Sequence, residues 1–434
     1  MAVADILLLG ATGYTGRLIA RYLCNHPQRA TFTLAVAGRS KVRLESLKTS
    51  VALDDRVELL QIDVAKPEEL DAAVEGVKVV INAVGPYWRW GTEVVRACTR
   101  HGVHYVDLAA ETPWIQKIIF KFDYFASKTN TIIIPSCGLV SAPADLLVHL
   151  ANKTLKDTLG PDVSLGESLT VYDMPGLASG GTYASALSLF EDVPRARLTA
   201  AMQDYSLSSA IHGAPSESLQ LARPVPFTRS GKHATFHPIS FPDRAVVQRT
   251  WGLHALAAQS VGLAPEDTDS ARRRTYGPRF TYDEGALSPV PWSVPSALIS
   301  AGWLVGLTLL MIFPPVRWIF KAFVPSPGEG PSDKVLEAGF IEATNYTTSA
   351  PSPDLPETHV KTVLRGRGDP GYLLSSMIIS ECALALLLDK SLLPPLARVG
   401  GVLTPASALG DVLINRLEAC GRFEFESVVV PPEE

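Results

Sequence analysis

The sequence predicts an α/β protein with an N-terminal Rossmann-type doubly wound parallel sheet, a second α+β domain and an apolar, membrane-associating helical insert. Three observations support this prediction. Short apolar runs alternate with helix-like stretches from residue 4 to about 135, a glycine-rich turn follows the first run, and residues 297–313 carry no charge. We expect domains at 1–140 and 141–434, the second including the apolar segment 289–324 and a C-terminal block at 361–434.

The first 135 residues contain six runs rich in Val, Ile and Leu, as expected of strands buried on both faces. These runs are DILLLG, FTLAVAG, VELLQID, VKVVINAVG, VHYVDLA and NTIIIPS. Between them, the spacing of apolar residues predicts helices at 16–26, 41–50, 66–76, 91–102 and 112–128. We expect Thr112 to cap the last of these helices, because Pro113 follows it.

After Ser136 the regular alternation ends, which indicates a different kind of domain. Residues 141–155 predict a helix, and SLGESLTVYDMPGLASGGTYASALSLF predicts a strand, a glycine-rich turn and another helix. In the C-terminal block, HVKTVLRGRGD predicts a strand and GYLLSSMIISECALALLLD a helix. Glu381 lies among apolar residues of that helix, so we expect it to be paired with another polar group.

The charge and cysteine content exclude some classes of partner. A formal net charge of −5, without clustered Lys and Arg, gives no reason to expect nucleic acid. The five cysteines are scattered and form no C-x-x-C pair, so we expect reduced thiols and no metal site. The N-terminus lacks the features of a secretory signal, and we expect this part of the protein to face the cytosol.

The glycine-rich turn GATGYTG predicts a dinucleotide site. Its glycines allow the tight turn from strand to helix, the approach of a pyrophosphate to the helix N-terminus, and close packing of the helix on the sheet. We assign to the cofactor the loop residues Gly10, Thr12, Gly13, Tyr14, Thr15 and Gly16.

The end of the second strand favours NADP over NAD. An Asp or Glu would hold the 2′-hydroxyl of NAD at this place, whereas the sequence has Arg39, Ser40 and Lys41, which suit a 2′-phosphate. Asp63, at the end of the third strand, is a candidate for the adenine region. Asn82 and Gly85, at the end of the fourth, are candidates for the nicotinamide ribose, although each could also be an ordinary loop residue.

Together with AGRS, NAVGPY, YVDLAAE, SGGTYASAL and GGVLTPASALG, the cofactor loop resembles the saccharopine dehydrogenase-like oxidoreductase family. The resemblance spans nearly the full length, and its relatives include the trans-acting enoyl reductases of mycobacterial lipid synthesis. It implies a nucleotide-binding domain, a substrate domain and an NADP-dependent reductase with a role in glycolipid synthesis or lipid metabolism. SCGLVSAPADL stands where the family has a CGFDSIPSDLG-like stretch, with Leu139 and Val140 in place of Phe-Asp.

The catalytic residues cannot be assigned by a motif, so we name candidates. Asp107 and Glu111 lie at the carboxyl end of the fifth strand, where open α/β sheets bind ligands. Glu111 is equally suited to the first turn of the helix at Pro113. Residues 179–182 form a glycine-bearing helix entrance for an anion or a plain helix cap, and Tyr183 beside them is a candidate proton donor.

The apolar segment falls somewhat short of the roughly 20 residues that cross a bilayer. Pro314 and Pro315 break it, and VRWIFKAF follows with Arg317 and Lys321, a composition typical of an interfacial helix. Three alternatives are a monotopic anchor, a single span, and a buried core or dimer helix. We favour the anchor.

The function expected from these features is hydride transfer from NADPH to an apolar or lipid-linked substrate, of enoyl or imine type. A soluble saccharopine-type amino-acid reductase is the alternative within enzymes, and a non-catalytic NADP-binding lipid-surface protein is the alternative outside them. The expected location is the cytosolic face of a membrane or lipid droplet, with the mitochondrion as another candidate. A homodimer is a further candidate assembly.

Overall fold

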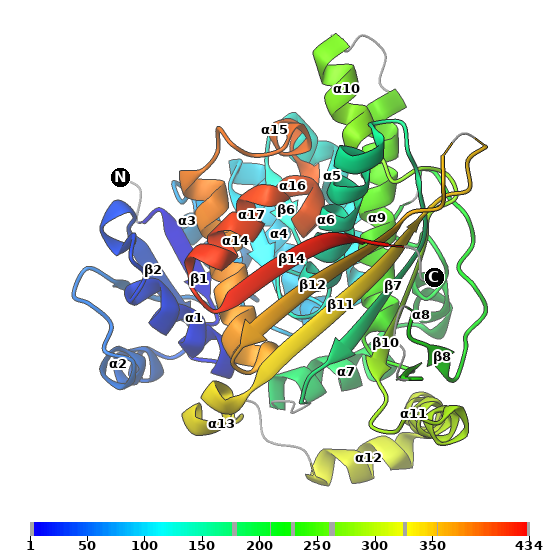
Figure 1. Cartoon of the computed structure of the whole chain (residues 1–434). Helices are drawn as coiled ribbons and strands as arrows, with labels where there is room; N and C mark the ends of the chain where they lie inside the picture. The colour runs from blue at the N-terminus through cyan, green and yellow to red at the C-terminus, as the bar shows by residue number, and fades with distance from the viewer. Residues whose placement is uncertain are drawn as a thin grey trace.

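The computed structural model describes residues 4–175, 180–208, 210–226, 231–259, 265–323, 328–353 and 355–431. Within these residues the chain forms two seven-stranded sheets (Figure 1). The strands β11, β12 and β14 of the second sheet cross the front of that view, and the helices of the first sheet lie to their left and behind them. The predicted α/β architecture is confirmed.

The first sheet is parallel throughout and has the order β13-β6-β5-β4-β1-β2-β3. Its strands are β1 (Ile6–Leu9), β2 (Leu34–Gly38), β3 (Glu58–Gln61), β4 (Val79–Asn82), β5 (His104–Asp107), β6 (Ile132–Ile134) and β13 (Gly401–Val402). Six of these lie within the predicted runs, which confirms the Rossmann-type sheet. The order reverses between β1 and β4, at the switch point where such sheets bind their ligands.

The strand β13 was not expected, because it consists of two residues in the C-terminal block. It pairs with β6 in parallel, with Gly401 opposite Ile132. A segment of the predicted second domain therefore completes the first sheet, and the division of the chain at residue 140 remains a prediction.

Helices cover both faces of the first sheet. They are α1 (Tyr14–Cys24), α2 (Lys41–Ser50), α3 (Pro67–Val74), α4 (Tyr87–His101), α5 (Thr112–Lys128) and α14 (Ser375–Leu388), with a short 3-10 helix at Arg29–Thr31. The buried side chains of α1, α2 and α14 pack on one face, and those of α3, α4 and α5 pack on the other. The residue that precedes α5 is Glu111, so the predicted cap at Thr112 is wrong by one position.

The second sheet is mixed and has the order β14-β12-β11-β7-β10-β9-β8. Its strands are β7 (Leu165–Asp173), β8 (Arg223–Pro224), β9 (His233–Thr235), β10 (Thr281–Leu287), β11 (Phe340–Ser349), β12 (His359–Arg367) and β14 (Phe423–Val430). Only β7 and β10 pair in parallel, and the other described pairs are antiparallel. The expected α+β character of this part is confirmed.

Helices of the second part pack around this sheet or connect it to the first. They are α6 (Ala142–Leu159), α7 (Gly180–Asp192), α8 (Arg195–Ala201), α9 (Ser240–Gln259), α10 (Pro265–Arg274), α13 (Asp333–Ala338), α15 (Pro395–Val399), α16 (Pro405–Ala408) and α17 (Asp411–Ala419). A π-helical turn, Pro370–Leu374, leads into α14.

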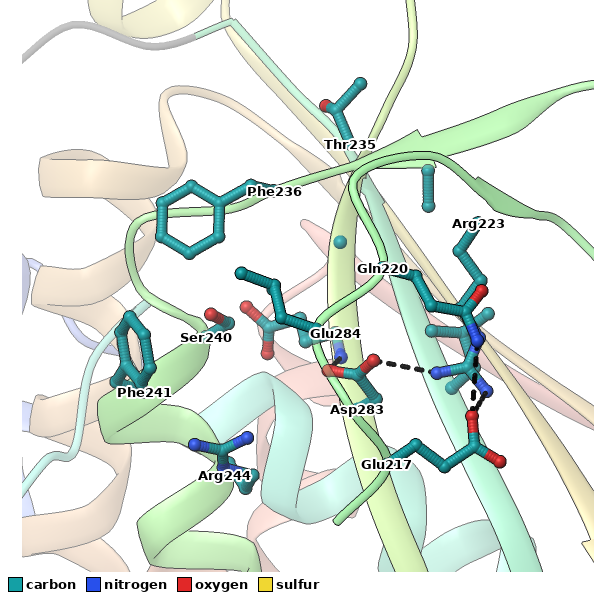
Figure 2. A pocket seen from close by; sticks show the side chains of 14 residues that line it. Glu217, Gln220, Arg223, Thr235, Phe236, Ser240, Phe241, Arg244, Asp283 and Glu284 are labelled. Atoms are coloured by element: carbon teal, nitrogen blue, oxygen red, sulfur yellow. Dashed lines mark hydrogen bonds and ion pairs between the residues drawn. The ribbon is translucent and has the colours of Figure 1, made fainter. Parts of the chain in front are cut away.

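A cavity of about 170 Å³ lies where β9 and β10 meet the start of α9 (Figure 2). Phe236, Phe241 and Arg244 line one side of it, and Arg223 and Asp283 line the other. Glu284 lies between these two groups.

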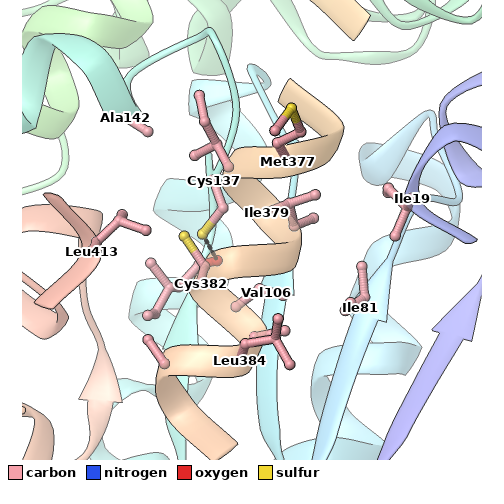
Figure 3. Close-up of a cluster of buried hydrophobic side chains, with 14 of the residues drawn as sticks. Ile19, Ile81, Val106, Cys137, Ala142, Met377, Ile379, Cys382, Leu384 and Leu413 are labelled. Atoms are coloured by element: carbon pink, nitrogen blue, oxygen red, sulfur yellow. Dashed lines mark hydrogen bonds between the residues drawn. The ribbon is translucent and has the colours of Figure 1, made fainter. Parts of the chain in front are cut away.

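The helix α14 is packed between the two sheets and belongs to the core (Figure 3). Its Ile379, Cys382 and Leu384 are buried in one cluster with Ile81 of β4 and Ile341 of β11. The segment Pro370–Leu388 is long and apolar enough to cross a membrane, yet 83% of its apolar window is buried. Burial on all sides explains why the helix carries apolar residues around its whole circumference.

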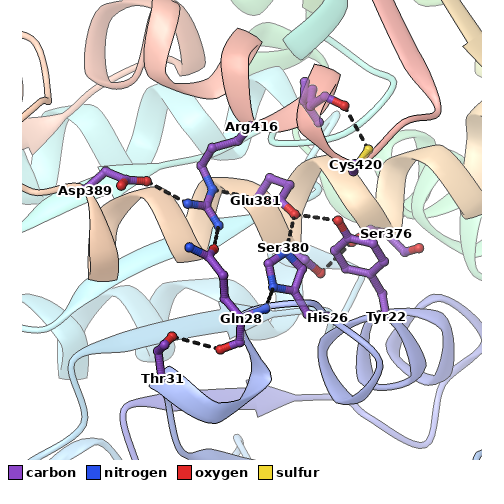
Figure 4. Close-up of polar contacts among 11 residues, drawn as sticks. Tyr22, His26, Gln28, Thr31, Ser376, Ser380, Glu381, Asp389, Arg416 and Cys420 are labelled. Atoms are coloured by element: carbon purple, nitrogen blue, oxygen red, sulfur yellow. Dashed lines mark hydrogen bonds and ion pairs between the residues drawn. The ribbon is translucent and has the colours of Figure 1, made fainter.

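Glu381 is the charged residue of α14, and it is paired as the sequence predicts (Figure 4). Its carboxylate lies 2.9 Å from Nε2 of His26 and accepts hydrogen bonds from Tyr22 and Arg416. Arg416 also donates to Asp389, at 2.7 Å. This network ties α1, which begins at the cofactor loop, to α14 and α17.

The apolar segment forms the helix α11 (Ser293–Ile312), and a second helix, α12 (Pro314–Phe323), follows it. The break falls at Phe313 and Pro314, as the two prolines predict. By length and composition α11 could cross a membrane, and only 11% of its apolar window is buried. This exposure distinguishes α11 from the core helix α14.

Candidate functional site

The turn from β1 to α1 requires two of its glycines. Gly10 has φ of +80°, and a Cβ there would stand 2.8 Å from the carbonyl oxygen of Ala83 after β4. A Cβ on Gly16 would stand 2.2 Å from the carbonyl oxygen of Gly10. Neither position tolerates a side chain, so the helix start lies directly against the strand end, as in dinucleotide-binding loops.

The start of α1 fits an anionic ligand. Gly13 is the N-cap and has no side chain to bond the first N–H groups of the helix, and the first turn contains no acidic residue. Such an N-terminus carries a partial positive charge, which suits a pyrophosphate. Thr15 is half-buried in this turn, and Thr12 contacts β2, since a Cβ on Gly38 would stand 3.3 Å from its hydroxyl oxygen.

The side chain of Tyr14 bonds outside this turn, and contact of Tyr14 with the cofactor stays a prediction. Its hydroxyl donates to the carbonyl of Pro331, and its ring packs edge-on against Tyr372 at 5.2 Å. Arg17 donates to the carbonyl of Gly328 at 3.1 Å, and Arg21 pairs with Asp333 at 3.1 Å. The stretch from 328 to 333, which follows the apolar helices in sequence, thus lies across the outer face of α1.

The end of β2 presents two exposed cations. Arg39 and Lys41 are both exposed, and Ser40 between them is the N-cap of α2, with its hydroxyl 3.4 Å from the backbone nitrogen of Arg43. Cations are unfavourable at a helix N-terminus unless an anion binds there. The position therefore fits the 2′-phosphate of NADP.

Asp63 makes hydrogen bonds within its own loop. Its Oδ1 accepts from the N–H of Ala65 at 3.1 Å, and its own N–H donates to Glu69 at 3.1 Å. These bonds shape the turn that precedes α3. Contact with the adenine is still a prediction for this residue.

Asn82 and Asp107 belong to one buried network at the carboxyl edge of the sheet. Asn82 donates to the hydroxyl of Tyr105 at 3.1 Å, and Tyr105 donates to Asp107 at 2.7 Å. Asp107 also accepts from the N–H groups of Ala109 and Ser136, at 2.8 and 3.0 Å. Burial raises the pKa of Asp107 to about 7, although these hydrogen bonds oppose the effect.

Glu111 anchors the start of α4. Its two carboxylate oxygens accept from the N–H groups of Tyr87 and Trp88, at 2.8 and 2.6 Å. Burial raises the pKa of Glu111, while these bonds and one from Ser185 lower it. The carboxylate thus serves the helix that follows β4 and not the helix at Pro113. This contact also explains why α4 begins four residues before the predicted helix.

The helix α7 lies over the carboxyl edge of the parallel sheet. A Cβ on Gly85 would stand 3.1 Å from the hydroxyl of Ser185, and Arg89 of α4 pairs with Asp192 at 2.6 Å. Tyr183 packs edge-on against Phe320 of α12 at 5.4 Å, so it faces the apolar helices. Ser179, at the predicted helix entrance, lies outside the described residues.

The structure adds residues that the sequence motifs did not identify. The hydroxyl of Tyr372 lies 2.7 Å from that of Thr182, which places the π-helical turn between the cofactor loop and α7. Ser375 accepts from the N–H of Leu139 at 2.8 Å, next to the end of β6. The sequence signal for this turn is the run GDPGY before an apolar helix, because Asp and Gly beside Pro predict a turn.

Among the described residues, no group of three or more His, Cys, Asp or Glu side chains is placed to hold a metal ion. The carboxyl edge instead combines a glycine turn at a helix start, two exposed cations and buried polar groups.

Comparison with known proteins agrees with this geometry. A family model described as the saccharopine dehydrogenase NADP binding domain matches residues 6–134, so the cofactor is NADP(H), as the cations after β2 predict. A Mycobacterium tuberculosis H37Rv protein, provisionally named a trans-acting enoyl reductase, is 32% identical and covers 96% of each chain. A protein of Mycobacterium ulcerans named a trans-acting enoyl reductase is 28% identical, again over 96% of each chain.

One solved structure shares the fold over the whole chain. Apo saccharopine dehydrogenase (L-Glu forming) from Saccharomyces cerevisiae aligns with a TM-score of 0.51 at 12% identity, covering 98% of this chain and 100% of the other. At this identity the likeness concerns the fold alone.

Proposed function

Because the chain belongs to the saccharopine dehydrogenase-like family of NADP-dependent oxidoreductases, we propose that it reduces a lipid-linked substrate at a membrane or lipid-droplet surface. The substrate would carry an electron-poor double bond, because relatives that match over the full length are named enoyl reductases. The protein would supply orientation, exclusion of water and a proton.

The lipid part of the proposal rests on one observation: α11 buries polar side chains and exposes apolar ones. The buried residues of this helix are Ser296 and Ser300, and both bond to the protein. Ser296 lies 2.7 Å from the hydroxyl of Ser288, and Ser300 accepts from the N–H of Phe236 at 2.8 Å. Leu298 and Trp303, by contrast, are 69% and 52% exposed. A helix that buries serine and exposes leucine is suited to an apolar surrounding.

The helix α12 continues this exposed surface. Trp318 is 76% exposed and Phe323 is 85% exposed. Arg317 is turned inward, where it bonds to carbonyls at the end of α11, and Lys321 pairs with Glu191 of α7 at 2.8 Å. The two cations therefore fix α12 to its neighbours, and attraction to lipid rests on the apolar and aromatic side chains.

Both ends of the helix pair α11 and α12 are attached to the rest of the protein. A monotopic anchor is therefore favoured over a single span. Ser296 and Ser300 attach the first half of α11 next to β9, and Tyr183 and Glu191 attach α12 to α7. With both ends on one side, α11 and α12 would lie along a lipid surface. In Figure 1 they form the lower margin of the molecule.

The helix α7 brings this surface close to the cofactor edge. One side of α7 contacts α12, and Ser185 on the same helix bonds to Glu111 beside the start of α4. Among the described elements, α7 contacts both the apolar helix α12 and Glu111 at the edge of the parallel sheet. This proximity supports a substrate drawn from lipid.

Lipid association is tested by flotation of the full chain with phosphatidylcholine vesicles. We expect the wild type to float, and the double variant Leu298→Asp, Val305→Asp to remain at the bottom of the gradient. Val42→Asp, at a valine of α2 that is 79% exposed, is the matched control and should float. Flotation of the double variant would refute the anchor.

Catalysis is tested by mixing the NADPH-loaded protein with vesicles that contain a trans-2-enoyl thioester, an imine or a ketone of equal chain length. We expect oxidation of NADPH with the enoyl thioester alone. Oxidation with the imine would favour the amino-acid reductase alternative, and binding of NADPH without oxidation by any probe would favour a non-catalytic role.

A further inference from the structure

The cavity shown in Figure 2 lies beside the attachment of the exposed helix α11. Ser300 of α11 accepts from the N–H of Phe236, which lines the cavity, and donates to the carbonyl of Leu221. Leu219 also lines the cavity, and both Leu219 and Leu221 are exposed. The apolar surface of α11 therefore continues onto the segment that borders the cavity.

The size of the cavity suits a small polar group. Its volume of about 170 Å³ corresponds to about six water molecules, at about 30 Å³ each. The rings of Phe236 and Phe241 lie 5.9 Å apart and form an apolar wall, and charged side chains lie on two sides of the cavity. The cavity thus has the dimensions of a lipid headgroup, and an acyl chain would remain outside it.

Arg244 of α9 supplies an incompletely paired cation on one side. Its guanidinium lies over the ring of Phe241, 5.5 Å from the centroid, and its Nε lies 3.5 Å from Asp204. Asp204 already accepts from the N–H and the hydroxyl of Ser216, at 2.7 and 2.8 Å. Within the part of the chain that the structure describes, no group accepts a hydrogen bond from Arg244. Its terminal nitrogens are therefore available to an anion in the cavity.

The opposite side of the cavity carries more negative than positive charge. Arg223 pairs with Asp283 at 2.7 Å and with Glu217 at 3.5 Å, and it also pairs with Glu167 (Figure 2). Three carboxylates thus share one cation. Asp283 and Glu217 line the cavity and are partly exposed, so their oxygens can accept hydrogen bonds from an ammonium group.

The charges on the two sides disfavour a simple ion and favour a zwitterion. An anion at Arg244 would also face Asp283 and Glu284, and a lone cation beside Asp283 would face Arg244. A ligand whose anionic group and ammonium group are joined by a short linker satisfies both sides. A primary ammonium is favoured over a trimethylammonium group, because it has N–H groups to donate to the carboxylates.

We propose that this cavity binds the phosphoethanolamine headgroup of a phospholipid, with the phosphate at Arg244 and the ammonium at Asp283 and Glu217. The acyl chains would lie outside, against Leu219, Leu221 and the exposed face of α11. This inference rests on the proposed function, because α11 brings the cavity to the lipid surface. Free phosphoethanolamine and free amino acids share the same chemistry, but the position of the cavity beside α11 favours the lipid.

Titration calorimetry of the full chain with soluble short-chain lipids measures this binding without reference to activity. We expect dihexanoyl phosphatidylethanolamine to bind at least about tenfold more tightly than dihexanoyl phosphatidylcholine. Arg244→Gln should weaken binding of the ethanolamine lipid by about tenfold. The double variant Glu217→Gln, Asp283→Asn should abolish the preference between the two lipids. Glu217→Gln alone, which keeps the pair of Arg223 with Asp283, should reduce the preference by about threefold.

The matched control is Arg365→Gln, at a partly exposed arginine of β11 that pairs with Glu342 at 3.2 Å. It should bind both lipids as the wild type does. Equal affinities of the wild type for the two lipids, or an unchanged affinity in Arg244→Gln, would overturn the inference.

Free ligands separate the lipid from the other sources of the same chemistry. Free phosphoethanolamine should compete with the ethanolamine lipid but bind at least about tenfold more weakly, because it lacks the acyl chains. Equal or tighter binding of free phosphoethanolamine, or of alanine, would overturn the assignment to a lipid. The double variant Leu298→Asp, Val305→Asp should still bind free phosphoethanolamine as the wild type does. Loss of flotation by the wild type would therefore count against the proposed function, and loss of the headgroup preference against this inference.

Discussion

Arg416 donates from Nε to Glu381 at 2.6 Å, and the carboxylate that accepts this bond is only 1% exposed. The pair links α17 to the core helix α14, and His26 extends it to the end of α1. Removal of one partner leaves the other charge buried and unpaired. We therefore expect Glu381→Ala to lower the free energy of unfolding by about 3–5 kcal/mol in a urea titration.

The pH dependence of this effect has a definite sign. Burial alone would raise the pKa of Glu381, but hydrogen bonding from His26 and the charge of Arg416 lower it below 4.5. A lowered carboxyl pKa stabilises the fold above the unfolded value, and this contribution is lost as the pH falls. The wild type should thus lose its advantage over Glu381→Gln below about pH 4.5. An advantage that does not shrink as the pH falls below about 4.5 would contradict the pairing.

Gly16→Ala should abolish NADPH binding, because its Cβ would meet the carbonyl oxygen of Gly10 at 2.2 Å. Quenching of the intrinsic tryptophan fluorescence by NADPH measures the effect. Gly302→Ala is the matched control, since nothing lies within 4 Å of the new Cβ on the exposed face of α11. The control should bind NADPH normally.

The double variant Arg39→Ala, Lys41→Ala should weaken NADPH binding by about 10- to 100-fold, because each cation contributes a charged hydrogen bond to the 2′-phosphate. Its affinity for NADH, which lacks this phosphate, should not change. Lys48→Ala, at the far end of α2, serves as the control. Equal losses for both nucleotides would place the phosphate elsewhere.

Asp107→Asn should flatten the pH dependence of stability. Burial raises the pKa of Asp107 from 3.8 to about 7, so the folded state holds a proton that the unfolded state releases. The free energy of unfolding of the wild type should therefore fall between about pH 4 and pH 7, by up to about 1.4 kcal/mol per pH unit from this group. Asp55→Asn, at an exposed carboxylate, should keep the wild-type slope.

The nucleotide domain could be predicted from the sequence because its signals are local. Six apolar runs and the GATGYTG turn fix the parallel strands, the switch point and the cofactor end of the sheet. The two-residue strand β13 could not be predicted, since it is a strand only by its pairing with β6. The family and the oxidoreductase class are confirmed by the family model over residues 6–134 and by a relative that is 32% identical over 96% of the chain.

The candidate site was less accessible to sequence reasoning because its polar groups come from distant segments. Thr182 and Tyr372, whose hydroxyls lie 2.7 Å apart beside the cofactor loop, are 190 positions apart in the sequence. Glu111 was a candidate for catalysis or for the first turn of the helix at Pro113. Its carboxylate bonds instead to the start of α4, which depends on how β4 and β5 lie side by side. The sequence likewise does not show that the serines of α11 face the protein, because this depends on the segments that pack against the helix.

The crossing of α1 by the stretch from 328 to 333 has a geometric consequence. Tyr14 and Arg17 in the helix that begins at the cofactor loop hold Pro331 and Gly328, which follow α12 closely in sequence. The apolar helices are thereby joined to the nucleotide-binding helix from one side and to α7 from the other. On a lipid layer, the protein would therefore adopt a single tilt relative to the bilayer normal. The cofactor loop would keep a constant height above the headgroups.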